Sequence, residues 1–243
     1  MGRVLVFLFG VVSYAVFFLA FLYAIGFVGN MVVPKSIDSG EQSGFGSALL
    51  INAVLLGLFA VQHSVMARSG FKKWWTKIVP SLAERSIFVL LASLLLLLLY
   101  WQWRPLTGVV WDVQNSALQT ILWLLFWLGW GIVLLATFMI NHFDLFGLRQ
   151  VYLYLKGKEY TPAGFRKLAF YKFVRHPIML GFIIAFWATP KMTAGHLIFA
   201  LATTAYILIA LQLEEKDLIA YHGEDYLQYR LEVSMLVPIP KKK

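Results

Sequence analysis

The segment Val4–Phe27 reads VLVFLFGVVSYAVFFLAFLYAIGF and runs for 24 residues without a charged side chain. A transmembrane helix needs about 20 predominantly apolar residues to cross a hydrocarbon core of about 30 Å. The segment also exceeds the apolar core of a signal peptide, and no small-residue cleavage site follows it. We therefore expect it to be a retained membrane span.

Three further stretches, Ser47–Ala67, Ser86–Trp103 and Ala117–Ile140, qualify in the same way. Two shorter apolar pieces, Ile178–Pro190 and His196–Leu213, follow after a polar stretch. The first piece is too short to span alone, and Pro and Gly at membrane depth need neighbouring protein or water to satisfy the backbone. The pattern therefore predicts four transmembrane helices and a bent C-terminal helical hairpin that enters and returns to the same side.

The composition excludes an ordinary soluble domain. The chain has 243 residues, of which 60% are hydrophobic and 14% charged, whereas soluble domains are about half apolar and about a quarter charged. It contains no Cys, which excludes a disulfide framework, a Cys-ligated metal centre and a thiol nucleophile. We expect an all-α integral membrane protein that forms one domain over residues 1–243.

The positive charges indicate the orientation. The net charge is 21 − 12 = +9, and the basic residues gather in two loops, with a net +4 over 68–85 and +5 over 141–177. The other two loops carry −1 and 0. Because basic short loops stay in the cytoplasm, we expect the amino terminus, both basic loops and the C-terminal tail there, and a lipid bilayer rather than nucleic acid as the partner.

Polar side chains within the apolar segments are candidate pocket residues, because polar groups at bilayer depth are costly. Asn52 and His63 lie 11 residues apart, about three helical turns, and share one helix face. They either line a common cavity or hydrogen-bond to other helices. His142 and Asp144 follow the fourth span and converge only if the helix ends there. The five histidines contain no i, i+4 pair, so we expect no metal site.

The most informative motif is Arg175-His176-Pro177-Ile178-Met179-Leu180-Gly181, where a basic stretch turns into the hairpin. Pro177 suits the first turn of a helix, which would place a cation, an imidazole and free helix amides side by side, a good receptor for a carboxylate. After the hairpin come Glu214-Glu215 and then Gly223-Glu224-Asp225-Tyr226 with Tyr229. Two adjacent acids beside a membrane require a compensating cation.

This pairing of an RHP-x-x-x-G element with a later E-E and G-E-x-Y-x-x-Y resembles the isoprenylcysteine carboxyl methyltransferase and nurim-like superfamily of membrane methyltransferases. The resemblance covers about the last 100 residues. The amino-terminal half, with QHSVMAR at 62–68 and ERS at 84–86, is similar to one bacterial branch, the methanethiol S-methyltransferases. The resemblance implies S-adenosylmethionine as methyl donor, a small thiol as acceptor and dimethyl sulfide as product. It also implies a bacterial inner-membrane location, with the cofactor site facing the cytoplasm.

The resemblance divides the chain into a four-helix membrane part, 1–140, and a cofactor-binding part, 141–243, made of a cytoplasmic segment and the hairpin. Carried over by motif, the cofactor-binding residues fall on Gln150, Tyr171, His176, Pro177 and Glu214. Their neighbours complete the expected set: Arg166, Arg175, Met179 and Glu215. In the prenylcysteine enzymes an Arg four residues before this acid helps to hold the substrate carboxylate, whereas this chain has Ala210 there, as a substrate without a carboxylate would allow.

Methyl transfer to sulfur needs alignment, exclusion of water and a thiolate in place of a thiol. As the base we expect His142, oriented by Asp144, with His63 as the second choice. Asn52 and His63 are the expected substrate-pocket residues.

Other functions remain open on the sequence alone. These are a carboxyl or phospholipid methyltransferase, a non-enzymatic nurim-like protein, and a His-ligated haem protein. Visible absorbance would reveal a haem, and calorimetry with S-adenosylmethionine would separate an enzyme from a nurim-like protein. The sequence predicts no oligomeric state.

Overall fold

The computed structural model describes residues 2–162 and 167–239. These residues are mostly helical, and five helices are long and apolar enough to cross a membrane. They are α1 (Arg3–Gly29), α2 (Phe45–Ala67), α4 (Ser81–Gln102), α5 (Ser116–Ile140) and α9 (Ala194–His222). Apolar side chains such as Leu19, Leu50 and Leu124 are more than 60% exposed on them, as lipid-facing positions are. The result agrees with the predicted helical membrane protein.

The last apolar helix is longer than predicted. The expected piece His196–Leu213 lies within α9, which has 29 residues and by length and composition alone is a fifth candidate span. Its partner helix α8 (Pro177–Trp187) has only 11 residues. The first arm is therefore short, as expected, whereas the second arm is longer than the predicted piece.

Within the described residues the chain forms two compact units, each made of two separate stretches. The first unit is the described part of Met1–Thr107 and Asn141–Ala163, and the second is that of Gly108–Ile140 and Gly164–Lys243.

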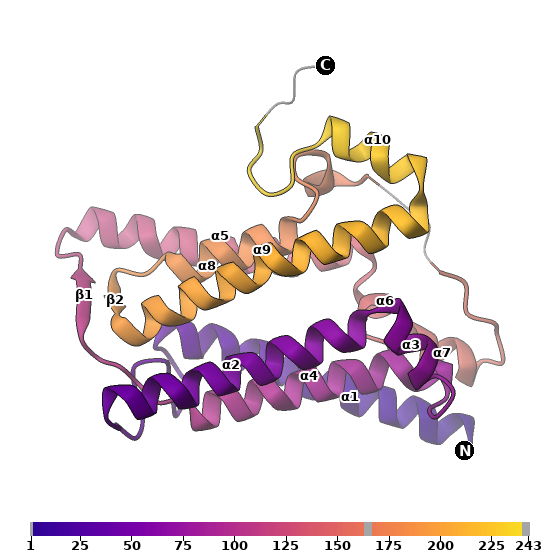
Figure 1. Cartoon of the computed structure of the whole chain (residues 1–243), viewed down its shortest axis with the longest axis horizontal. Coiled ribbons are helices and arrows are strands. Elements are labelled where there is room, and N and C mark those ends of the chain that lie inside the picture. Colours follow the sequence, from indigo (N-terminus) through magenta and orange to yellow (C-terminus); the bar gives the residue numbers. More distant parts are fainter. Residues whose placement is uncertain (1, 163–166, 240–243) are drawn as a thin grey trace. The chain divides into compact units, whose positions relative to one another are not determined.

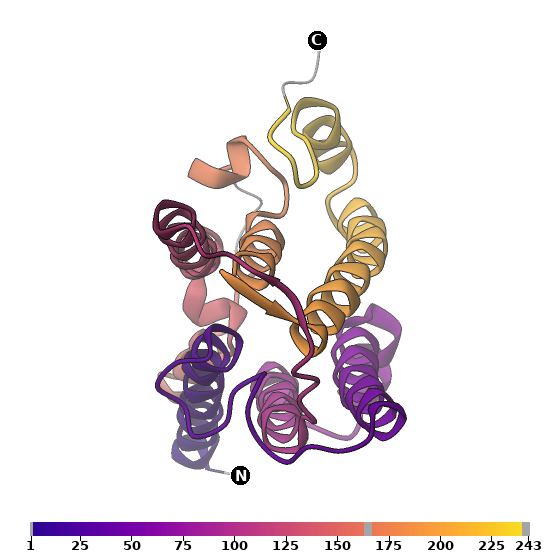
Figure 2. The ribbon, with the colours of Figure 1, turned by 90° about the vertical axis from the view of Figure 1, so that its left-hand side faces the viewer.

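In the first unit, α4 packs between α1 and α2 (Figure 2). Short helices complete this unit: α3 (Ser69–Trp75), α6 (His142–Leu145) and α7 (Leu148–Leu155), of which α7 packs on α1. Aromatic contacts join α1 to α4 at one end, where Tyr23 stacks on Tyr100 with ring centroids 5.2 Å apart. In the middle of α1, Phe17 stacks on Phe146, which lies between α6 and α7, at 3.8 Å. The second contact anchors the segment between α6 and α7 on α1.

In the second unit, α8 packs along α5 and α9 turns back beside α8. The remaining elements of this unit are β1 (Val109–Asp112), the 3₁₀ helix η1 (Ala169–Lys172), β2 (Lys191–Thr193) and α10 (Glu224–Glu232). Gly223, with φ +57°, turns the chain from α9 into α10. This conformation suits glycine because it has no Cβ, which explains the glycine that precedes the predicted acidic and tyrosine motif.

A two-stranded antiparallel ribbon is the feature that the all-α prediction does not contain. Val109 pairs with Thr193 and Asp112 with Lys191, with a bulge in between. Trp111 adds a hydrogen bond from its Nε1 to the Thr189 carbonyl, at 3.1 Å. The ribbon lies at one end of α5 and α9, and α10 lies at the other end of α9 (Figure 1). It fixes the tip of the α8–α9 hairpin beside the start of α5.

Candidate functional site

One buried carboxylate, that of Glu215 in α9, organises the RHP element. Its Oε1 atom accepts from Arg175 Nε at 2.7 Å and lies 2.6 Å from Arg175 Nη2 and 3.1 Å from His176 Nε2. Its Oε2 atom lies 3.1 Å from Arg230 Nε. The side chains of Glu215, Arg175 and His176 are each 6% exposed. The structure thus brings together three of the predicted residues and supplies the compensating cations that the adjacent acids require.

Glu214 is placed differently from its neighbour. Its side chain is 44% exposed, and its Oε2 atom lies 4.0 Å from His176 Nδ1. His176 therefore faces both acids, one through each ring nitrogen. Because Glu215 is already surrounded by cations, Glu214 is the acid that remains accessible to a ligand.

The segment after α10 holds the RHP element through its backbone. The amide of Arg175 donates to the Ser234 carbonyl at 2.9 Å, and the amide of His176 donates to the Met235 carbonyl at 3.2 Å. Arg175 Nη1 also donates to the Val233 carbonyl. Since α8 begins directly after these residues, at Pro177, the C-terminal segment fixes the entry into that helix.

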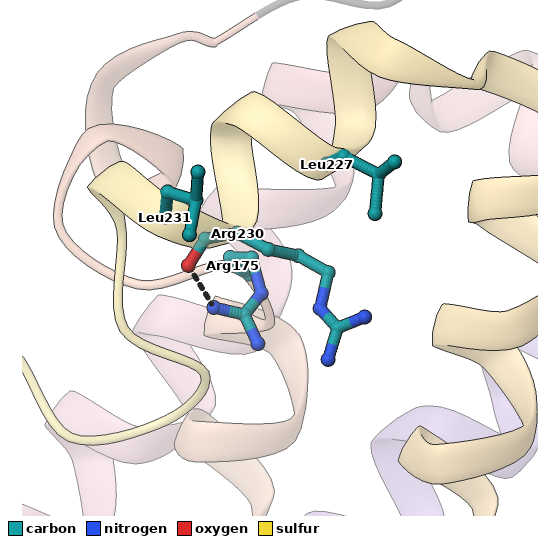
Figure 3. Close-up of a pocket in the computed structure, with 4 residues that line it drawn as sticks. All are labelled: Arg175, Leu227, Arg230 and Leu231. Atoms are coloured by element: carbon teal, nitrogen blue, oxygen red, sulfur yellow. Dashed lines mark hydrogen bonds between the residues drawn. The ribbon is translucent and has the colours of Figure 1, made fainter.

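A pocket of about 350 Å³ opens beside this cluster. It is lined by Arg175, Leu227, Arg230 and Leu231, so two guanidinium groups and two leucine side chains face the same space (Figure 3). Arg230 is 41% exposed there. Such a lining suits an anionic group that is attached to an apolar or flat body.

Three tyrosines surround the cluster as hydrogen-bond donors. Tyr226 donates to Glu215 Oε1 at 3.5 Å, Tyr229 to the Tyr171 carbonyl at 2.6 Å, and Tyr171 to the Ala136 carbonyl at 3.5 Å. Burial raises the pKa of Tyr229 to about 12. Burial, together with the nearby carboxylates Glu214 and Glu215, also raises the pKa values of Tyr171 and Tyr226. All three phenols therefore stay protonated at neutral pH.

The other predicted cofactor residues of this unit are Pro177, Met179 and Arg166. Pro177 is buried and Met179 is half-buried, and both lie in the first turn of α8. Arg166 lies outside the described residues.

The glycine of the RHP-x-x-x-G element has a packing role. A Cβ on Gly181 would lie 2.7 Å from the Gly129 carbonyl oxygen, and one on Gly129 would lie 2.7 Å from the Gly181 carbonyl oxygen. The two glycines therefore allow α5 and α8 to approach closely, as small residues do in membrane helix pairs.

The predicted base, His142, lies in the first unit and is 4% exposed. Its Nε2 atom is 2.8 Å from the Tyr14 hydroxyl oxygen in α1, a partner that no local sequence pattern indicated. Burial lowers the pKa of His142 below its ordinary value. The imidazole is therefore neutral at neutral pH and can accept a proton.

Asp144, the residue expected to orient His142, has contacts with other groups. Its Oδ2 atom lies 3.4 Å from both Arg149 Nη1 and the Tyr160 hydroxyl. Its Oδ1 atom is buried without a hydrogen bond. Gln150 belongs to the same turn, since its Nε2 donates to the Asp144 carbonyl at 3.0 Å while its Oε1 is also buried without a hydrogen bond. Two acceptors of this turn thus lack donors among the residues that the structure describes.

Asn52 and His63 are held in different surroundings along α2. The Asn52 amide bonds to the backbone of Arg104, with Nδ2 donating to the carbonyl at 2.7 Å and Oδ1 accepting from the amide at 2.9 Å. The His63 ring lies between Phe59 and Phe88, and its Nδ1 is buried without a hydrogen bond. Eleven residues of helix separate the two by roughly 16 Å, too far for both to line a pocket for one small thiol.

Comparisons with known proteins agree with the motifs. The family model described as NnrU protein matches residues 50–217. A methanethiol S-methyltransferase of Mycobacterium tuberculosis is 61% identical over 242 residues, which is 100% of this chain and 99% of that protein. One of Crocosphaera subtropica is 55% identical over 243 residues, 100% of this chain and 95% of that protein.

Nurim of Mus musculus is more distant, with 28% identity over 203 residues, 76% of this chain and 77% of that protein. No solved structure matches the chain. The predicted resemblance to the methanethiol S-methyltransferases and the nurim-like proteins is thus confirmed, and the chain belongs to the NnrU protein family.

Proposed function

We propose that the protein transfers a methyl group from S-adenosylmethionine to methanethiol and releases dimethyl sulfide. The observation that carries this proposal is the 61% identity, over the whole chain, to a methanethiol S-methyltransferase. Ala210, in place of the carboxylate-holding Arg of the prenylcysteine enzymes, supports an acceptor without a carboxylate.

The residues present fit a donor that carries an ammonium, a sulfonium and a carboxylate. In the second unit, the accessible Glu214 carboxylate suits a cation, and the guanidinium groups of Arg175 and Arg230 suit a carboxylate. In the first unit, Gln150, which the family resemblance assigns to cofactor binding, has a buried Oε1 that accepts no hydrogen bond from the described residues. S-adenosylmethionine would supply a methyl group bound to a positively charged sulfur. The neutral thioether that remains is a good leaving group.

The chain's own residues then have to deprotonate the thiol and exclude water. We assign the base to His142, which is buried and neutral at neutral pH. His63 stays the second choice, because its Nδ1 is buried without a hydrogen bond. Asp144 is retained as a member of the site through the turn that it shares with Gln150. Asn52 loses support as a substrate-pocket residue, since its amide is satisfied by Arg104.

We further propose that the whole chain works as one methyltransferase domain in a bacterial inner membrane. The amino terminus and the segments 68–85 and 141–177 lie on the cytoplasmic side in this proposal, which rests on their excess of Lys and Arg. Four helices, α1, α2, α4 and α5, cross the membrane, and α8 and α9 form the hairpin.

Donor binding is the first test of this proposal. Calorimetry with S-adenosylhomocysteine should detect binding to the purified protein, and His176→Ala should weaken it about tenfold or more, because a charge-assisted hydrogen bond contributes about 1.5 to 3 kcal/mol. Wild-type protein that binds neither this ligand nor S-adenosylmethionine would favour a non-enzymatic role.

A further inference from the structure

The basic loop between two candidate spans contains the short helix α3, which the proposed function does not use. A single residue separates α3 from the end of α2, and α4 begins at Ser81, soon after α3 ends (Figure 1). Since α2 and α4 are both long and apolar enough to cross a membrane, the segment 68–80 lies where their apolar stretches end. It contains four basic residues and no acid, a net charge of 4 − 0 = +4.

One side of α3 packs on the interior of the first unit. Phe71 and Trp75, one helical turn apart, pack on the buried cluster of Met66, Phe88 and Val89. Residues four apart on a helix lie on the same side. This packing therefore holds α3 with one side toward the protein and presents the other side outward.

Two pairs of side chains form the outward side, which we call the α3 surface. Trp74 is 53% exposed and Ile78 is 63% exposed, and Lys73 and Lys77 are exposed as well. The helical course continues past α3, since the amides of residues 77 and 78 donate to the carbonyls of residues 74 and 75 at 3.1 and 2.9 Å. At 3.6 residues per turn, the apolar pair lies between the side that packs on the protein and the lysine pair.

This surface has the character of a membrane boundary. Neither lysine has an ion-pair partner within residues 2–162 and 167–239. Tryptophan is enriched where a bilayer meets water, and lysines there extend their charge toward the headgroups. Val61 and Val65, near the end of α2, are 63% and 45% exposed, so the lipid-facing side of that helix continues up to α3.

We propose that the α3 surface binds an anionic phospholipid, with its phosphate between the ammonium groups of Lys73 and Lys77 and its glycerol region against Trp74 and Ile78. Cβ atoms four residues apart on a helix are about 5 to 6 Å apart, so two lysines on flexible stems reach the oxygens of one phosphate. Basic clusters directly beyond a membrane span are typical of anionic-lipid binding. The lipid site is separate from methyl transfer and does not depend on it.

Mass spectrometry of the intact protein in detergent tests the lipid preference, because it counts bound lipids and gives a dissociation constant for each lipid added. Wild-type protein should bind dioleoylphosphatidylglycerol more tightly than dioleoylphosphatidylcholine. Lys73→Gln together with Lys77→Gln should weaken binding of the first lipid about twenty-five-fold, about fivefold for each lysine. Soluble glycerol phosphate should not displace the lipid, because it has no apolar part.

Lys156→Gln together with Lys158→Gln is the matched control. This variant removes the same charge from two other exposed lysines of the first unit. It should bind phosphatidylglycerol as the wild type does. Equal weakening by both double variants would mean that only the net charge matters.

A spin label measures which side of α3 faces lipid, because the chain contains no Cys that would compete for the label. In nanodiscs that contain phosphatidylglycerol, a label at Ile78→Cys should be relaxed mainly by oxygen, which concentrates in the apolar part of the bilayer. A label at Thr76→Cys is the control, since Thr76 is exposed and lies on the opposite side of the turn from Ile78. It should be relaxed mainly by a water-soluble nickel chelate.

The inference is overturned if the Lys73 and Lys77 variant binds phosphatidylglycerol as tightly as the wild type, if both double variants weaken binding equally, or if the wild type binds both lipids equally. Displacement by glycerol phosphate would also overturn it, because the site would then take a free phosphate. A label at residue 78 that meets the nickel chelate would leave the α3 surface to water or a protein partner. None of these measurements requires methyl transfer, so the proposed function stands or fails separately.

Discussion

Glu214 and Glu215 are neighbours in the sequence, yet their side chains have different partners. Glu215 is 6% exposed and touches Arg175, His176 and Arg230, whereas Glu214 is 44% exposed. We therefore expect the two acids to serve different purposes, the first to hold the RHP element and the second to meet the donor.

Glu215→Gln should destabilise the fold, because it leaves the Arg175 guanidinium buried without its counter-charge. Breaking a buried ion pair costs about 3 to 5 kcal/mol. Glu214→Gln should leave the stability nearly unchanged but weaken donor binding about tenfold or more. Thermal unfolding in detergent and calorimetry with S-adenosylhomocysteine measure the two effects. Equal loss of stability in both variants would contradict the division of roles.

The proposed base makes the reaction depend on pH in a defined direction. Burial lowers the pKa of His142 from about 6.5, so the base stays neutral at pH 6.5 and is lost only as the pH falls through its lowered value. We expect the acid limb of the kcat profile with methanethiol to lie below about pH 6.5.

His142→Ala should slow methyl transfer by about 10² to 10⁴ and remove that acid limb. Only thiolate formed in solution then reacts, so the remaining rate should rise steadily toward alkaline pH, since a free thiol has a pKa of about 8.5 or above. Stopped assays on both sides of neutral pH measure the two profiles. An active His142→Ala enzyme beside an inactive His63→Ala enzyme would move the role to His63.

Part of the site could be predicted from the sequence because its members flank a single hairpin. Arg175 and His176 precede α8 and Glu215 lies near the end of α9, so one turn of the chain brings them together. Tyr14 could not be predicted, because its pairing with His142 depends on how α1 packs against α6. The contacts of the Asp144 carboxylate with Arg149 and Tyr160 were not predicted either, because they depend on how the chain folds back after α7.

Among the helices, the contact between α5 and α8 depends on two glycines. Gly129→Ala and Gly181→Ala should each place a methyl group 2.7 Å from a backbone oxygen of the opposite helix. Overpacking of this kind costs about 1 to 3 kcal/mol. Because α8 starts at the RHP element, donor binding should weaken together with stability.

Gly131→Ala is the matched control on α5, because nothing lies within 4 Å of the added Cβ. It should be neutral or slightly stabilising, since Ala favours a helix by about 0.8 to 1 kcal/mol over Gly. Unfolding temperatures of the three variants measure the difference. Three equal values would mean that the helices do not depend on this close approach.

The β ribbon indicates how far the α8–α9 hairpin extends across the membrane. β1 precedes α5 on the side that the charge pattern assigns to the exterior, and β2 at the hairpin tip pairs with it. A cysteine that replaces the exposed Lys191 should therefore react with an impermeant maleimide outside intact cells, where the chain's lack of Cys gives no background. Failure of this cysteine to react would indicate that the tip lies within the membrane. The sequence did not predict this ribbon, because strands so far apart in the chain leave no local periodicity.

Across the chain as a whole, the charge pattern predicts which loops face the cytoplasm. Cysteines at Ser69 and Thr161, both exposed, should be shielded from an external impermeant reagent, whereas one at Ser39 should react. Labelling after permeabilisation is the control for reactivity. The reverse pattern would put the proposed donor site on the exterior, where S-adenosylmethionine is not supplied.

The long apolar helices could be predicted, because apolar length decides whether a helix can cross a bilayer, although α9 is a fifth candidate span where the sequence predicted a hairpin arm. The division of the chain into two units could not be predicted from the sequence. The second unit combines 108–140 with the described part of the chain after residue 164, and that grouping depends on the packing of α5 against α8 rather than on any change in composition.

The identity of the methyl acceptor is tested most directly by one competition of substrates. Purified protein is incubated with S-adenosylmethionine labelled in its methyl group and with methanethiol, hydrogen sulfide, a prenylcysteine or phosphatidylethanolamine, each in turn. Labelled dimethyl sulfide should form from methanethiol with the highest kcat/KM of the four. Preferred transfer to the prenylcysteine or the phospholipid, or no transfer to methanethiol, would contradict the proposed function.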